Sequence, residues 1–167
     1  MWLRVQMSCA STAVEEPGLE PMLRRAVLSH ASLEASLAHV LAHRLASAEF
    51  PAEMWHHAIG EVLFPTRVGS AVWPLSEGIH PLPVLAREDL RCVHERDPAC
   101  LDEAHALLHF KGFQCLQAHR VAHVLWHHFA RRRLAVAFQS RCSEVFGMDL
   151  HPAATIGMGV MFDHGTG

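Results

Sequence analysis

Three polar residues near the C-terminal end of the sequence could form an acid–base site. Asp149, Asp163 and His164 all lie between positions 148 and 167. A carboxylate within hydrogen-bond reach of one imidazole nitrogen fixes the tautomer, and it stabilises the cation that forms when the other nitrogen takes a proton. A dyad of Asp149 and His164 would therefore be a general base for a hydroxyl group. The alternative is that Asp149 caps a turn and His164 is a polar surface residue.

The segment that carries these residues has a six-residue apolar repeat. Its bulky positions are Leu150, Ile156 and Phe162, with Gly157, Gly159, Gly165 and Gly167 between or after them. This period is typical of a parallel β-helix. Three hexapeptides, 150–167, would make one triangular coil with Asp149 and His164 near neighbouring corners. One coil cannot bury its apolar face, since roughly three or more stacked repeats are needed. We therefore expect a β-helix that is truncated at Gly167.

Upstream of this segment the apolar residues follow the helical period. We expect helices within residues 21–46, 51–63, 84–96, 101–110, 112–129 and 131–146, with Ser32 as the cap of a second helix inside the first range. The core candidates are Phe113, Leu116, Val121, Val124 and Leu125, followed by Leu134, Val136, Ala137, Phe138 and Val145. Residues 64–83 contain four prolines and two glycines without a period, so we expect an irregular loop there.

The composition excludes several classes of protein. The net charge is −3, and the only cationic cluster, Arg131–Arg133, is too short to neutralise a row of phosphates, which argues against nucleic-acid binding. Five cysteines without a C-x-x-C pair indicate reduced thiols inside a cell. No apolar run approaches the roughly 20 residues of a membrane span, and the N-terminus does not resemble a secretory signal. We expect a cytoplasmic protein.

Histidines at helical spacing offer a rival chemistry. His119, His123 and His127 follow one another at intervals of four, as do His105 and His109. Two histidines four apart on a helix can bind a transition metal. No H-E-x-x-H motif, cysteine pair or matching carboxylate accompanies them, so we expect no metal site and interpret these histidines as packed or solvent-facing. Cys115 and Cys142 are interpreted as small core residues.

Three motifs stand out, namely R-D-P-A-C from Arg96, K-G-F-Q-C-L-Q-A-H-R-V-A-H-V-L-W from Lys111, and D-L-H-P-A-A-T-I-G-M-G-V-M-F-D-H-G-T-G from Asp149. Together they resemble serine O-acetyltransferase, most closely its plant and algal forms. The resemblance covers roughly residues 20–63 and 84–167. It implies transfer of acetyl from acetyl-CoA to the hydroxyl of L-serine, which gives O-acetylserine for cysteine biosynthesis.

The resemblance also implies roles for single residues. His164 would be the base and Asp149 would orient it, while Asp97 and Asp163 would hold the substrate serine. From the sequence alone Asp97 could equally be a helix-stop residue. No bound cofactor is implied, because acetyl-CoA is a co-substrate, and its site would lie in coils beyond Gly167. We therefore expect the chain as far as Gly167 to be inactive by itself.

The implied architecture is mainly α. We expect a disordered N-terminus over residues 1–19, an α-helical bundle over 20–147, and the first coil of a truncated left-handed parallel β-helix over 148–167. The family forms homotrimers, often paired through the N-terminal helices into a hexamer, and docks its C-terminal tail into O-acetylserine sulfhydrylase. A plastid or mitochondrion is the alternative location. The alternative functions are a non-catalytic helical oligomerisation module and a His-rich metal-binding bundle.

Overall fold

The computed structural model describes residues 1–64 and 80–165, and this part of the chain is helical without strands. The N-terminal portion contains α1 (Trp2–Glu15), a 3-10 turn (Pro17–Leu19), α2 (Glu20–Leu23) and a π-helical turn (Arg24–Leu28). The remaining helices are α3 (Leu33–Leu45), α4 (Ala52–Leu63), α5 (Leu82–Arg96), α6 (Glu103–His109), α7 (Lys111–His127) and α8 (Arg132–Phe146). The expectation of a mainly α fold is confirmed.

Local sequence signals start and stop several of these helices. The Ser32 side chain accepts a hydrogen bond from the backbone N–H of Ala35 at 3.2 Å, as expected for the cap of α3. Asp102 caps α6 in the same way, through His105 N–H at 2.7 Å. Gly147 ends α8 with φ of +74°, in the left-handed region that favours glycine. These short-range contacts explain why the expected helix bounds differ little from the observed ones.

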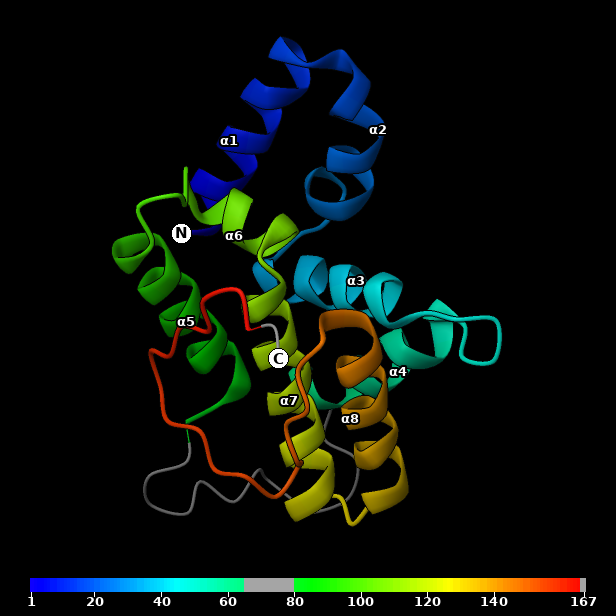
Figure 1. Cartoon of the computed structure of the whole chain (residues 1–167). Helices are drawn as coiled ribbons and strands as arrows, with labels where there is room; N and C mark the ends of the chain where they lie inside the picture. The colour runs from blue at the N-terminus through cyan, green and yellow to red at the C-terminus, as the bar shows by residue number, and fades with distance from the viewer. Residues whose placement is uncertain (65–79, 166–167) are drawn as a thin grey trace.

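Helix α7 is the central element of the bundle and contacts α4, α5, α6 and α8 (Figure 1). The core candidates on α7 are all buried. On α8 the expected core residue Val136 is wrong, because it is 45% exposed. The buried side of α8 carries Ala135, Phe138, Cys142 and Phe146. Val136 follows Ala135 by one residue, which is about 100° around a helix, so it lies off this face.

The N-terminus is ordered, which corrects the expectation of disorder over residues 1–19. Helix α1 buries Val5 and Cys9, four residues apart, against the rest of the bundle. Arg4 forms an ion pair with Glu103 at the start of α6. The two buried residues of α1 are spaced along a helical face and do not form a continuous apolar run, and tertiary contact with α2 and α6 stabilises that face.

The expected irregular loop, 64–83, falls mainly on residues 65–79, which lie outside the described residues. Its C-terminal end differs from the expectation, because Leu82 and Pro83 already belong to α5. A proline in the first helical turn lacks only an N–H that would have no partner inside the helix. Among the described helices, none is long and apolar enough to cross a lipid bilayer.

The segment after α8, residues 148–165, is an extended tail that wraps the bundle. Figure 1 shows it running beside α7, crossing to α5 and returning towards the start of α7. Leu150 and Phe162, two of the three bulky repeat positions, pack against the core. No residue of the tail up to 165 is in a strand. A strand requires a paired neighbour, and one coil has none stacked on it, so the β-helix remains a prediction.

Candidate functional site

A cleft of about 420 Å³ opens where the end of α5, α6 and the start of α7 meet the end of the tail. Its lining contains Asp97, Asp163 and His164, three of the four residues expected at the site. The other lining residues are Ala99, His105, His109, Phe110, Lys111, Gly112 and Phe162. Two carboxylates and several nitrogen bases therefore face one space, which suits a small molecule carrying both charges.

Asp97 ends α5 and borders the cleft at the same time. It is the residue that follows the last helical position, and its Oδ1 accepts a hydrogen bond from Ala99 N–H at 2.8 Å. The turn fixes this side chain by a local contact, so its place at the cleft does not depend on the tail. Asp97 therefore both ends α5 and lines the cleft.

Asp163 and His164 lie on the opposite wall in a tight turn of the tail. His164 Nε2 is 3.6 Å from Asp163 Oδ1, and the His164 side chain is 90% exposed. Gly165 N–H donates to the carbonyl oxygen of Asp163. His164 adopts φ of +50°, a left-handed conformation that is uncommon for residues other than glycine and is concentrated at functional sites.

Asp149 does not line this cleft. Its Oδ1 accepts a hydrogen bond of 2.6 Å from Gln139 Nε2 on α8. Between Asp149 and His164, both of which the structure describes, there is no hydrogen bond. The expected dyad therefore remains a prediction, and in this structure the carboxylate nearest to the imidazole is that of Asp163.

Three side chains of α7 hold the extended tail by its carbonyl groups. His123 Nδ1 lies 2.8 Å from Pro152 O, and His119 Nε2 lies 3.1 Å from Ala154 O. Because carbonyl oxygens only accept, each of these nitrogens carries a proton. Arg120 donates to Ile156 O at 3.1 Å and to Gly157 O at 2.6 Å. These bonds satisfy backbone groups that have no strand partner.

Two of the histidines considered as metal ligands, His119 and His123, therefore have other partners. Within residues 1–64 and 80–165, no group of three or more His, Cys, Asp or Glu side chains could hold a metal ion. Cys115 and Cys142 are buried, as expected for small core residues. Cys115, Cys142 and His119 are thus packed in the interior, whereas His127 is exposed.

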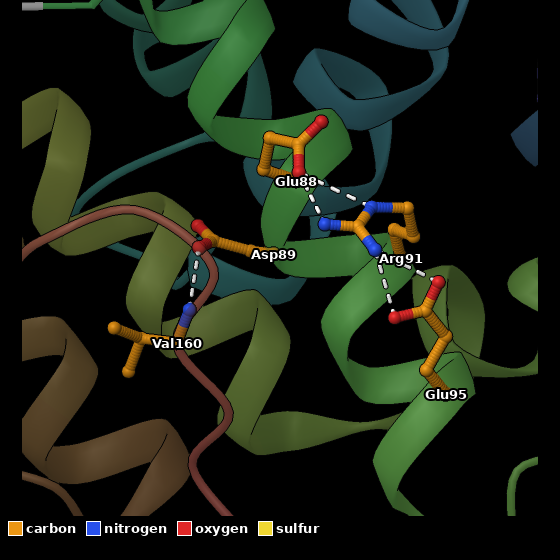
Figure 2. A network of polar contacts seen from close by, with 5 residues as sticks. All are labelled: Glu88, Asp89, Arg91, Glu95 and Val160. Atoms are coloured by element: carbon orange, nitrogen blue, oxygen red, sulfur yellow. Dashed lines mark hydrogen bonds and ion pairs between the residues drawn. The ribbon is translucent and has the colours of Figure 1, made fainter.

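A buried ion pair fixes the middle of the tail to α5 and α7. The Asp89 carboxylate is fully buried and accepts hydrogen bonds from Arg120 Nε at 2.7 Å, Arg120 Nη2 at 3.0 Å and Gln117 Nε2 at 2.8 Å. Figure 2 shows Asp89 also reaching the tail, where Val160 N–H donates to Oδ1 at 3.0 Å. Four donors on one carboxylate compensate its loss of hydration.

Neither Asp89 nor Arg120 was among the residues predicted from the sequence. Asp89 lies in the apolar stripe of α5 that contains Leu82, Ala86, Leu90 and Val93. A charged residue at such a position is almost never buried without a partner. That local inconsistency is the signal that could have revealed the pair, although it would not have named the partner.

Acidification should destabilise the fold through His119. Burial lowers the pKa of His119 from 6.5 to about 4. The unfolded chain takes up this proton below about pH 6.5 and the folded chain only near pH 4, so the unfolded state binds more protons between those values. The stabilisation is complete above pH 6.5 and is lost, by up to about 3 kcal/mol, as the pH falls towards 4.

Urea unfolding at several pH values between 4 and 7 would measure this loss. His39 contributes in the same direction, because burial lowers its pKa to about 4. His119→Gln, whose amide can still donate to Ala154 O, should show a smaller acid loss, whereas the exposed His57→Ala should keep the full one. If the free energy of unfolding fell equally with pH in His119→Gln and in the unsubstituted protein, His119 would not be the source of the acid loss.

Comparison with known proteins decides the family. A family model described as serine acetyltransferase, N-terminal, matches residues 1–118. The chain belongs to the serine acetyltransferase family. A probable serine acetyltransferase 1 from Oryza sativa subsp. japonica is 42% identical over all of this chain and half of its own length. The chain thus spans about half the length of the curated serine acetyltransferases that it matches.

Solved structures of the serine acetyltransferase family have the same fold. The soybean enzyme complexed with serine is 39% identical, with a TM-score of 0.86 over 99% of this chain and 63% of its own. The Brucella abortus enzyme in complex with coenzyme A is 29% identical, with a TM-score of 0.88 over 100% of this chain and 61% of its own. Both pairings extend over the tail as well as the helices.

Proposed function

We propose that the full-length protein transfers the acetyl group of acetyl-CoA to the hydroxyl of L-serine, producing O-acetylserine for cysteine biosynthesis. The observation that carries this proposal is the cleft that Asp97, Asp163 and His164 share. The soybean relative is described as complexed with serine and the Brucella abortus relative as complexed with coenzyme A. One substrate of the proposed reaction, serine, and one product, coenzyme A, are therefore ligands of related proteins.

In the proposed reaction His164 is the general base. A serine hydroxyl is a weak nucleophile at neutral pH, so the imidazole takes its proton as the oxygen attacks the thioester carbonyl. The C–S bond then breaks, and the proton from His164 passes to the departing thiolate of coenzyme A. Asp97 and Asp163 hold the substrate ammonium group by charge. For Asp149 to orient His164, it must exchange its contact with Gln139.

The site in a single chain is open to water, which supports an oligomeric enzyme. His164 is 90% exposed, and proton transfer at a catalytic base benefits from exclusion of water. We propose that residues 148–167 begin a left-handed β-helix after a helical domain over 20–147. Homotrimers of this β-helix, or hexamers, would place a neighbouring subunit over the cleft. Acetyl-CoA would bind to further coils of this β-helix.

The test is an acetyl-transfer assay on the full-length protein with acetyl-CoA and L-serine. Release of free coenzyme A thiol should depend on L-serine. N-acetyl-L-serine retains the hydroxyl but lacks the ammonium group, so it should be a much poorer substrate if Asp97 and Asp163 bind that group. Thiol release without dependence on serine would contradict the proposal.

A helical oligomerisation module is the second candidate, because α1 carries an unpaired apolar face. Leu3, Met7 and Val14 are 68%, 63% and 81% exposed and lie on one side of the helix. Apolar stripes of this kind are typical of helix pairing between subunits. A protein that assembles in sedimentation experiments but transfers no acetyl group would favour this candidate.

A further inference from the structure

Gly112 occupies a helical position that alanine would suit better. It lies in the first turn of α7 and does not have a positive φ, so its backbone conformation does not require glycine. Glycine weakens a helix relative to alanine because it loses more conformational freedom. A reason for glycine at this position must therefore come from outside the helix.

That reason is the close approach of the tail. A Cβ atom on Gly112 would lie 1.9 Å from the carbonyl oxygen and 2.9 Å from the carbonyl carbon of Phe162. Real Cβ contacts are essentially never below 3.0 Å, so the Phe162 backbone or α7 would have to move by about 1 Å. Phe162 is followed directly by Asp163 and His164, and the same cleft contains Gly112.

Hydrogen bonds restrain both sides of this contact, the start of α7 and the tail before Phe162. On the α7 side, Gln114 Nε2 donates to Leu107 O at 3.0 Å and to Leu108 O at 2.9 Å, which fastens the first turn to α6. On the tail side, Val160 N–H is bound to the buried Asp89. A displacement must therefore be absorbed between positions 161 and 165, where the proposed catalytic turn lies.

The far end of that turn is also closely packed. Gly165 has φ of +61°, and a Cβ on it would lie 2.1 Å from Met148 Sδ. The turn therefore lies between the hydrogen bond of Val160 to Asp89 before it and the Met148 side chain packed against Gly165 after it. Movement of Phe162 would change the position of Asp163 and His164 relative to Asp97, which its own turn holds in place.

We infer that Gly112 is a positioning residue of the proposed acetyl-transfer site. Because Gly112 has no side chain, the Phe162 backbone can pack directly against α7. This contact sets the distance from Asp163 and His164 to Asp97. The inference rests on the proposed function. It adds a residue that touches neither the substrate nor the reacting atoms and acts through the backbone of Phe162.

The experiment compares Gly112→Ala with Gly60→Ala in the full-length protein. Gly60 is a matched control, because it also lies inside a helix and a Cβ on it would meet nothing within 4 Å. Gly112→Ala should lower kcat/KM for L-serine by about 100-fold, since a misplacement of about 1 Å can have that effect. KM for serine should rise as kcat falls, and the thermal unfolding midpoint should remain near that of the unsubstituted protein. Gly60→Ala should match the unsubstituted protein in kcat/KM, in KM and in the thermal unfolding midpoint.

Amide hydrogen exchange supplies a readout that does not depend on activity. In Gly112→Ala, exchange should accelerate in residues 160–165 and remain slow in α7. A fall in kcat alone, with KM unchanged, would indicate a smaller folded fraction and overturn the inference. So would a kcat/KM within twofold of the unsubstituted protein, or loss of the folded state. If the unsubstituted protein and Gly60→Ala transfer no acetyl group, the proposed function fails. Faster amide exchange of residues 160–165 in Gly112→Ala would still show that Gly112 positions the Phe162 backbone.

Discussion

Replacing Asp89 with alanine should lower the free energy of unfolding by about 3–5 kcal/mol. The substitution leaves the Arg120 guanidinium, which is 4% exposed, without its counter-charge in the interior. It also removes the acceptor for Gln117 and for Val160 N–H. A buried charge without a counter-charge is costly because it has lost its hydration, and the two carbonyl oxygens that Arg120 still reaches carry no net charge. Urea denaturation followed by circular dichroism would measure the loss.

The neighbouring residue supplies the control for this measurement. Glu88 precedes Asp89 on α5 and pairs with Arg91 at the surface (Figure 2). Glu88→Ala should change the free energy of unfolding by less than about 1 kcal/mol, as is usual for exposed ion pairs. A loss below about 1 kcal/mol for Asp89→Ala as well would show that the network in the interior does not stabilise the fold.

Replacing His164 with alanine should reduce kcat for acetyl transfer by about 10²–10⁴-fold. The variant removes the group proposed to accept the serine proton and leaves Asp97 and Asp163 available to hold the substrate. KM for L-serine should therefore change much less than kcat. The stability of the fold should not change, because the His164 side chain is 90% exposed. Steady-state kinetics with the full-length protein would separate the two parameters.

Chemical rescue offers an independent check on the role of His164. Removal of the imidazole leaves a space of the size of that ring, so added imidazole should restore part of kcat. His57→Ala removes another exposed histidine, 75% exposed on α4, and should leave kcat unaltered. Unchanged turnover in His164→Ala would assign the base to a different residue.

Much of the helical bundle could be predicted because its signals are local. Ser32 caps α3 through a residue three positions later, and Gly147 stops α8 through its own backbone angle. The stripe of Phe113, Leu116, Val121, Val124 and Leu125 is buried as its period predicts. Each of these features depends on neighbours within one or two turns of helix, which a linear sequence displays directly.

The errors occurred where distant residues decide the outcome. Helix α1 was missed because its two buried residues, Val5 and Cys9, stabilise it only through contact with α2 and α6. Val136 was placed in the core because an apolar residue on a helix does not reveal which face has a partner. In both cases the deciding free energy comes from tertiary packing, and helical propensity alone is too weak to supply it.

The sequence by itself determined the kinds of chemistry available, namely the carboxylates Asp97 and Asp163, the imidazole of His164, and the motifs that resemble serine O-acetyltransferase. Only the tertiary structure brought Asp97 to the same cleft as His164, because the two are 67 positions apart and meet through the packing of α5, α6 and α7. It also paired Asp89 with Arg120 and seated Phe162 on Gly112. Hydrogen bonds and close contacts act over a few ångströms in space, and a sequence orders residues only along the chain.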